Sequence, residues 1–283
     1  MNRLQETLLI CSHELRRMLR TPKAAILLLL YALVASLSGL VFVHVSGVLG
    51  DQLDAHQMRS IVEELDLYRK TVGLFFGDEA LALDWLLQMP PFLLFFYKFN
   101  LFFLPALVVL MGFDQVSGEL AARSLRYLAP RAHRSSILLG KVLAELILLV
   151  ALTGLMGLGA VLFTRSAPEA SWGVTLLGML RFEVLTIFVM LAYLGLVALF
   201  STLTRTPLYA LVFAFCALIL LWLVGALGST QSLSFLRWFA PATYEPSLLS
   251  AQALLVVRSV AAYLAFTALF LGGALFRLNR ADL

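Results

Sequence analysis

Long runs of apolar residues alternate along the chain with short polar segments. A helix needs about 20 residues to cross a hydrocarbon core, and the runs reach that length. The strict apolar–polar alternation of barrel strands does not occur. We therefore predict an all-α integral membrane protein with six spans. They lie at 24–45, 92–113, 142–163, from between 174 and 182 to 200, 207–227 and 254–276.

The residues before the first span show a different pattern. An apolar stripe at steps of three and four is formed by Leu4, Leu8, Cys11, Leu15 and Met18. Charged side chains lie largely off that stripe, which is typical of a helix in the membrane interface. Thr21 is a suitable N-cap and Pro22 a suitable first residue for the next helix. We expect an interfacial helix over 1–20.

Two segments between spans have a composition of their own. The stretch 50–91 contains eight of the seventeen acidic residues, so it is expected outside the membrane, either as a docking surface or gate, or as a solvated face over a packed one. The stretch 229–250 is broken by Pro241 and Pro246, yet it carries aromatic side chains. Irregular backbone at membrane depth is tolerated where protein buries it. We expect short re-entrant helices there.

Basic residues indicate the orientation. With both termini in the cytoplasm, thirteen of the 21 lysines and arginines face the cytoplasm, as the positive-inside rule requires. The loop 114–141 then lies on the cytoplasmic side, and 50–91 and 229–250 lie outside. A chain that is 61% hydrophobic and 13% charged fits one transmembrane domain over 1–283 and not a soluble protein.

Composition and motifs also limit the chemistry. The four histidines are scattered without the spacing of metal ligands, and the G-x-S-x-G, H-E-x-x-H and P-loop motifs do not occur. We therefore expect no catalytic residues, no metal and no cofactor in this chain. A basic patch interleaved with aromatic residues is also missing, so nucleic acid is not an expected partner.

The second span contains a broad aromatic face. Phe95, Phe99 and Phe102 lie on it together with Lys98, about two turns into the span. A lysine there either lines a polar cavity or extends its ammonium to the outer interface. The four residues are a candidate substrate pathway, and packing or lipid contact is the alternative for the phenylalanines. In the third span, Glu145 is within helical reach of Lys141, and we expect a local ion pair.

The densest positive cluster of the chain follows the second span. It contains the segments FDQVSGE at 113–119, LRYL at 125–128 and SILLGK at 136–141. Together they resemble the type-two (ABC-2-type) membrane family of ATP-binding-cassette exporter permeases. In that family an Asp and a Ser-Gly-Glu follow the second span, and I-L-L-G-K leads into the third. One departure is LAARS at 120–124, where family members usually carry Gly-Thr and more charge.

The resemblance implies a permease subunit of an ABC exporter in the cytoplasmic (inner) membrane of a bacterium. ATP and Mg²⁺ would bind a separate ATPase subunit. The other expected partners are a second copy or a related permease, membrane lipid, and an extracytoplasmic protein at 50–91. A permease without a P-loop needs a stiff cytoplasmic element that docks on its ATPase.

Residues 120–128 suit such a coupling helix, which Pro130 would stop. Its apolar face would enter a groove of the ATPase, and its charges would fix the orientation. The expected ATPase-coupling residues are Asp114, Glu119, Leu120, Arg123, Leu125, Arg126 and Leu128. The alternative is a turn that only anchors the chain by its positive charge.

Two other classes of function compete with the exporter. A secondary carrier without an ATPase would need paired ionisable residues near the bilayer midplane. Only Lys98, Arg181 and Glu183 are candidates for that role. A membrane enzyme would need a convergent polar site. An assembly scaffold would not depend on ATP.

Overall fold

The computed structural model describes residues 2–54, 91–124, 132–164, 172–228, 231–248 and 252–280. Within these ranges the chain forms helices and no strand, which confirms the all-α prediction. The elements are α1 (Arg3–Arg20), α2 (Pro22–Asp54), α5 (Pro91–Gly112), α6 (Ser117–Ala121), α8 (Arg134–Thr164), α9 (Trp172–Leu203), α10 (Pro207–Leu227), η1 (Gln231–Phe239), η2 (Pro241–Tyr244), α11 (Glu245–Leu248) and α12 (Ala253–Arg280).

The described helices include five stretches that are long and apolar enough to cross a membrane. They are Phe95–Ala121, Arg134–Leu162, Trp172–Leu203, Pro207–Leu227 and Ala253–Arg280. A sixth is counted if the bent pair α1 and α2 forms one span. Because α2 contains the expected first span, the multi-pass architecture is confirmed, while the number six and the cytoplasmic side of the termini stay predictions.

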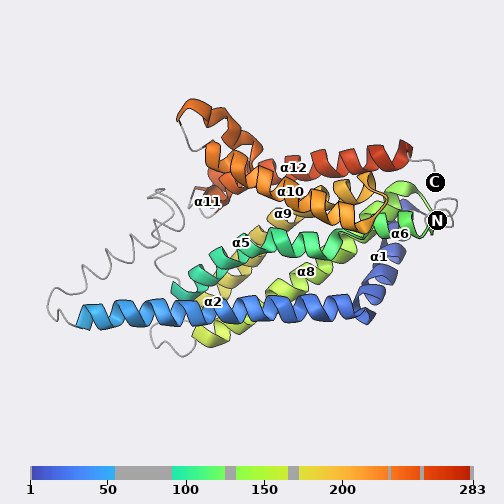
Figure 1. Ribbon diagram of the computed structural model, residues 1–283. Coiled ribbons are helices and arrows are strands. Elements are labelled where there is room, and N and C mark those ends of the chain that lie inside the picture. The colour runs from blue at the N-terminus through green and yellow to red at the C-terminus, as the bar shows by residue number, and fades with distance from the viewer. Residues whose placement is uncertain are drawn as a thin grey trace.

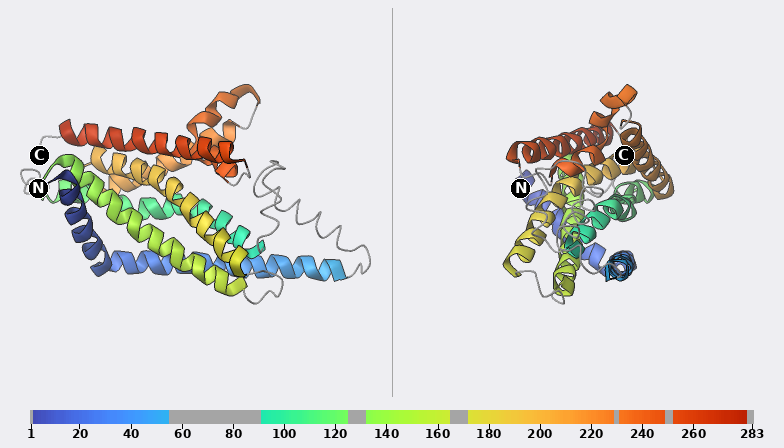
Figure 2. Two further views of the ribbon diagram at one scale, coloured as in Figure 1. Left: turned by 180° about the vertical axis from the view of Figure 1, so that it is seen from behind. Right: turned by 90° about the vertical axis from the view of Figure 1, so that its left-hand side faces the viewer.

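Helix α9 forms the centre of the bundle. It packs against α5, α8, α10 and α12, and Figure 2 shows it between the last of these and α8. Val189, Met190 and Val197 on this helix are almost completely buried. A helix that is apolar on all sides is stable only where other helices surround it, which explains its central position.

A sharp bend separates α1 from α2. The two helices meet at 72°, at Thr21 and Pro22. Proline has no backbone N–H and favours an extended residue before it, and Thr21 is extended with φ −88° and ψ 143°. As a result α1 turns across the end of the bundle, where α6 lies (Figure 1).

Close contact fixes α1 against α8. A Cβ atom on Gly140 would lie only 2.9 Å from Ile10 Cβ and from the Thr7 carbonyl oxygen, so only glycine fits here. Cys11 and Glu14 face α8 and are buried, whereas most of the leucines of the predicted stripe remain exposed. The helix therefore has two apolar faces, one packed on α8 and one open.

The end of the bundle that holds α6 also holds the start of α8 and the end of α12. There the guanidinium of Arg134 donates to the carbonyl oxygens of Leu278 and Asn279, at 2.5 and 2.9 Å. The helix α8 starts at Arg134, two turns earlier than the predicted span, because Ile137 and Leu138 continue its buried face. The loop predicted at 114–141 is correspondingly shorter.

The opposite end carries the short helices of the predicted re-entrant segment. The elements η1, η2 and α11 pack against α10 and α12. The Tyr263 hydroxyl of α12 donates to the Pro241 carbonyl oxygen at 2.8 Å and is fully buried. The position of this segment in the membrane stays a prediction. Most of the acidic stretch 50–91, from residue 55 to 90, lies outside the described residues.

Candidate functional site

Helix α6 is held in place by a serine from the central helix. The hydroxyl oxygen of Ser201, in α9, accepts hydrogen bonds from the backbone N–H groups of Val116 and Ser117, both at 3.0 Å. All three residues are buried. The first N–H groups of a helix lack partners within it, and Ser201 supplies an acceptor here. The start of α6 is thereby fixed to α9.

A charge cluster, which we call the Lys141 cluster, joins α6 to α1 and α8; all of its members are buried except Arg17, which is half-exposed. It consists of Glu14, Arg17, Glu119 and Lys141. The Lys141 ammonium lies 2.7 Å from a carboxylate oxygen of Glu14 and 2.7 Å from one of Glu119. Arg17 lies 3.0 Å from Glu14 and 3.5 Å from Glu119. Because the Lys141 side chain is only 2% exposed, losing the lysine would leave two buried carboxylates without the cation that they share.

A second ion pair joins α2 to the end of α5. The Lys23 ammonium pairs with Asp114 and donates to the Met111 carbonyl oxygen at 2.8 Å. It also lies 4.4 Å from the ring centroid of Phe113. A cation near the last carbonyl groups of a helix is stabilised by the helix dipole. The side chains of Lys23 and Asp114 are 32% and 41% exposed, so water screens this pair more than the Lys141 cluster.

A cavity of about 200 Å³ separates the two groups of charges, and Gln115 and Glu145 complete its wall. Glu145 is 1% exposed and packs against α5 where a Cβ on Gly112 would lie 2.7 Å from its carboxylate. The predicted ion pair between Glu145 and Lys141 is wrong. The lysine extends toward α1 and α6, where two carboxylates hold its ammonium.

The structure describes only residues 120–124 of the expected coupling helix at 120–128. Helix α6 ends at Ala121, and residues 122–124 form a turn in which Arg123 has a φ of 55°. The left-handed backbone of Arg123 interrupts the expected helix after Ala121, and α6 begins three residues before the expected start, at Ser117. Arg123 is exposed and Leu120 is partly buried. The remaining predicted coupling residues, Leu125, Arg126 and Leu128, lie outside the described residues.

The two acidic coupling residues differ in exposure. Glu119 is 8% exposed and belongs to the Lys141 cluster, whereas the side chain of Asp114 pairs with Lys23 and is 41% exposed. Glu119 therefore faces into the protein, and Asp114 is partly open to solvent. Sequence analysis also missed Glu14, although its position between Cys11 and Met18, at the edge of an apolar stripe, was a signal for a buried acid.

Two of the four residues of the candidate substrate pathway, Lys98 and Phe102, line a cleft near the other end of the bundle. Phe95 and Phe99 are partly buried with ring centroids 6.1 Å apart, while Phe102 is 69% exposed. The Lys98 ammonium lies 3.5 Å from a carboxylate oxygen of Glu245 in α11. Burial raises the pKa of the Glu245 carboxyl, and Lys98 opposes that shift. The cleft has a volume of about 620 Å³.

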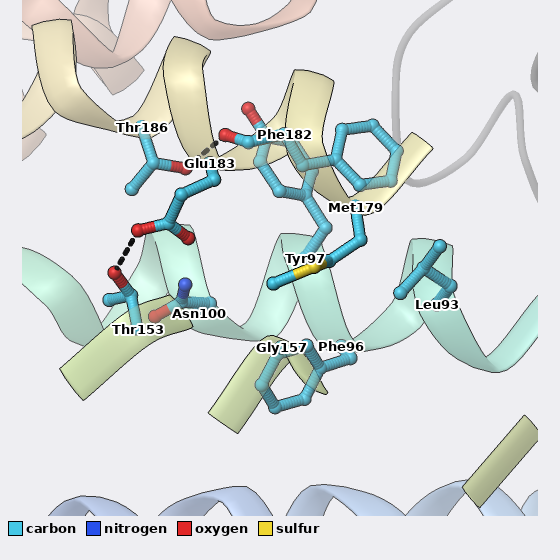
Figure 3. A pocket seen from close by; sticks show the side chains of 10 residues that line it. All are labelled: Leu93, Phe96, Tyr97, Asn100, Thr153, Gly157, Met179, Phe182, Glu183 and Thr186. Carbon is cyan, nitrogen blue, oxygen red and sulfur yellow. Dashed lines mark hydrogen bonds between the residues drawn. The ribbon is translucent and has the colours of Figure 1, made fainter. Parts of the chain in front are cut away.

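A much smaller polar pocket lies inside the bundle (Figure 3). The Thr153 hydroxyl donates to the Glu183 carboxylate at 2.6 Å, which joins α8 to α9. Nearby, the Tyr31 hydroxyl of α2 donates to the Asn100 side chain of α5 at 2.6 Å. The pocket volume of about 20 Å³ admits no more than one water molecule. These two bonds join α8 to α9 and α2 to α5, and the pocket between them has no room for a substrate.

The described residues contain no group of three or more His, Cys, Asp or Glu side chains that could hold a metal ion. Comparison with known families gives one match. The model of a family described as "ABC-2 family transporter protein" matches residues 8–283, which is nearly the whole chain. No curated protein matches the sequence.

Proposed function

Because the chain belongs to the ABC-2 family of transporter proteins, we propose that it is the permease subunit of an ABC exporter. A separate ATPase subunit would bind ATP and Mg²⁺ and would dock on α6 and the turn that follows. The permease would then export its substrate across the cytoplasmic membrane of a bacterium. We further propose that it acts as a pair of permease chains, with a second copy or a related chain.

The observation that most supports this proposal is the way in which α6 is connected to the bundle. Ser201 ties it to α9, and the Lys141 cluster ties it to α1 and α8. Asp114, at the end of α5, pairs with Lys23 at the start of α2. A force applied to this five-residue helix would therefore reach five long helices at once. A turn that only oriented the chain by its charge would not need these buried bonds.

The residues of α6 and its turn that are exposed to solvent form the surface available to an ATPase. Ala121, Ala122 and Arg123 are exposed, whereas Glu119 is not. The segment that follows would complete a short apolar element with Leu125 and Leu128, suited to a groove on the partner. In this arrangement the inward charges of α6 transmit the movement and the outward residues make the contact.

The substrate path is proposed along the aromatic face of α5. Phe95, Lys98, Phe99 and Phe102 would line it, and the cleft beside Lys98 would form its wide part. The open faces of the bundle suit lipid or the second permease. On α2, for example, Ile26, Leu29 and Leu33 are each more than half exposed.

The proposal is tested by co-purification in mild detergent from the native host. Proteins retained by the wild-type chain are identified by mass spectrometry and compared with those retained by Arg123→Glu and Leu125→Asp. The matched control is Arg205→Glu, which makes the same charge change at another exposed site between α9 and α10. Glu119 is not used, because its substitution would disturb the buried cluster.

We expect a P-loop ATPase with the wild type and with Arg205→Glu, and its loss from the other two variants. If no ATPase is retained by the wild type, the proposed function is wrong, and a carrier or scaffold would replace it. If the ATPase stays bound to Arg123→Glu and Leu125→Asp, the chain is a permease that docks through another surface.

A further inference from the structure

The short helix η1 projects sideways from the bundle at the end opposite α6. In Figures 1 and 2 the orange segment that precedes α12 extends beyond that helix, away from the other spans. It packs against α10 and η2. A Cβ atom on Gly228 would lie 2.7 Å from Arg237 Cγ, and the Tyr244 hydroxyl donates to the Trp238 carbonyl oxygen at 3.2 Å. These contacts hold η1 beside the end of α10.

The projecting helix exposes large aromatic side chains. Phe235, Trp238 and Phe239 are 58%, 59% and 62% exposed, respectively. The guanidinium carbon of Arg258, in α12, lies 5.0 Å from the centroid of the Trp238 ring, so the start of α12 lies next to η1. There Val257 is 64% exposed and extends the apolar surface. An exposed apolar patch of this kind marks a contact with a membrane or with another molecule.

The polar and aromatic residues of η1 lie on different sides of the helix. Side chains three residues apart share one side of a 3₁₀ helix. Phe235 and Trp238 have that spacing, and so do Ser234 and Arg237. Because η1 lies between α10 and α12, which are both able to span a membrane, it lies where the spans end. Amphipathic segments with aromatic and basic residues are typical of the membrane interface.

The exposed surface of this segment is positively charged. Between residues 228 and 260 the sequence contains two arginines, Arg237 and Arg258, and one acid, Glu245. Both arginines are exposed, whereas the Glu245 side chain is 14% exposed and lies 3.5 Å from Lys98 in the cleft. A symmetric contact with a second copy would bring four arginines together. Phosphate groups would instead neutralise them, since guanidinium and phosphate form paired hydrogen bonds.

We propose that η1 and the first turns of α12 bind the head groups of anionic phospholipids in the leaflet at this end of the bundle. Arg237 and Arg258 would donate to lipid phosphate oxygens, and Phe235 and Trp238 would lie among the upper acyl carbons. An arginine near a membrane surface strengthens binding to anionic lipid by about fivefold. The proposal does not rest on the proposed function, because none of these four residues lines the cleft or belongs to α6.

The test measures fluorescence quenching of the purified full chain in nanodiscs with equal amounts of phosphatidylglycerol and phosphatidylcholine. Cys216→Ser removes the exposed native thiol, and Cys11 is buried. A bimane fluorophore is attached at Phe235→Cys, on the aromatic side of η1, or at Ser234→Cys, the matched control on the polar side. The quencher is bromine on the acyl chains of one of the two lipids, or iodide in the water.

We expect brominated lipid to quench the probe at 235 and iodide to quench the probe at 234. At 235, brominated phosphatidylglycerol should be enriched at least about fivefold over brominated phosphatidylcholine. Arg237→Gln/Arg258→Gln should remove this preference, although glutamine keeps the Cγ atom that packs on Gly228. The control Arg205→Gln, at an exposed site between α9 and α10, should retain it. Size-exclusion profiles confirm that the variants are folded.

Quenching of the probe at 235 by iodide alone would place this surface in water, and quenching by neither reagent would mean that another protein chain covers it. Either result would overturn the proposal. Equal quenching by the two brominated lipids, or a preference that survives in the double variant, would also overturn it. Because no ATPase takes part, these results are independent of whether an ATPase co-purifies with the chain.

Discussion

The ammonium of Lys141 lies 2.7 Å from the Glu119 carboxylate, and both side chains are buried where α8 meets α6. Glu14 of α1 accepts from the same ammonium at the same distance. Three elements that are far apart in the sequence therefore share one cation. This relationship makes α6 a part of the bundle and explains how an acid in the most basic stretch of the chain turns inward.

Replacing Lys141 by methionine should destabilise the protein strongly. The change leaves Glu14 and Glu119 without their buried partner, and breaking a buried ion pair costs about 3–5 kcal/mol. Thermal unfolding in detergent, followed by size-exclusion chromatography, measures the loss. The triple variant Lys141→Met/Glu14→Gln/Glu119→Gln should regain most of it. Equal stability of Lys141→Met and wild type would contradict the buried cluster.

Replacing Lys23 by methionine should have a much smaller effect. Its pair with Asp114 is partly exposed, and pairs of that kind contribute about 1 kcal/mol or less. The same thermal assay, at low and at high salt, checks this expectation, because salt should weaken the Lys23 pair and leave the Lys141 cluster nearly unchanged. A larger loss from Lys23→Met than from Lys141→Met would reverse the order that burial predicts.

Replacing Ser201 by alanine should loosen α6. Two buried N–H groups, of Val116 and Ser117, would lose their acceptor, at about 1–3 kcal/mol for each group left unpaired. Hydrogen exchange of the peptide around α6 should become faster, while exchange around Thr153 and Glu183 stays unchanged. The neighbouring Thr202→Ala serves as a control, since its hydroxyl bonds only within α9. Unchanged exchange at α6 would mean that Ser201 does not hold it.

Replacing Gly140 by leucine should separate α1 from α8. Even a single Cβ would lie 2.9 Å from Ile10 and Thr7, and leucine adds three further carbons. Limited proteolysis should then cut within α1, which is protected from cleavage in the wild type. Gly159→Leu is a control on the same helix, because a Cβ there meets nothing within 4 Å. Equal cleavage of both variants would contradict the close contact.

Features that depend on neighbouring residues could be predicted from the sequence, whereas features that depend on contacts between distant residues could not. The spans follow from local apolar runs, and the bend before Pro22 follows from proline itself, so both were predictable. A helix that begins at Ser117, three residues before the expected coupling helix, escaped prediction because Ser201, 84 residues from Ser117, holds its start. No local pattern contains that contact.

The inward position of Glu119 escaped prediction for the same reason. Its neighbours in sequence include several arginines, which suggested an exposed charged surface. The partners that bury it are Lys141, which the sequence had assigned to Glu145, and Arg17 of α1. The choice among carboxylates for Lys141 depends on how α1 packs on α8, and the small size of Gly140 was the one sequence feature that allows this packing.

In the proposed complex, α6 and its turn receive the ATPase subunit. The most direct measurement is site-specific photo-crosslinking in living cells, with a photoreactive amino acid at Ala122 or, as a control, at Arg205, both exposed. We expect an adduct at Ala122 that mass spectrometry identifies as a P-loop ATPase, and none at Arg205. An ATPase adduct at Arg205 alone, or no ATPase adduct at either site, would contradict it.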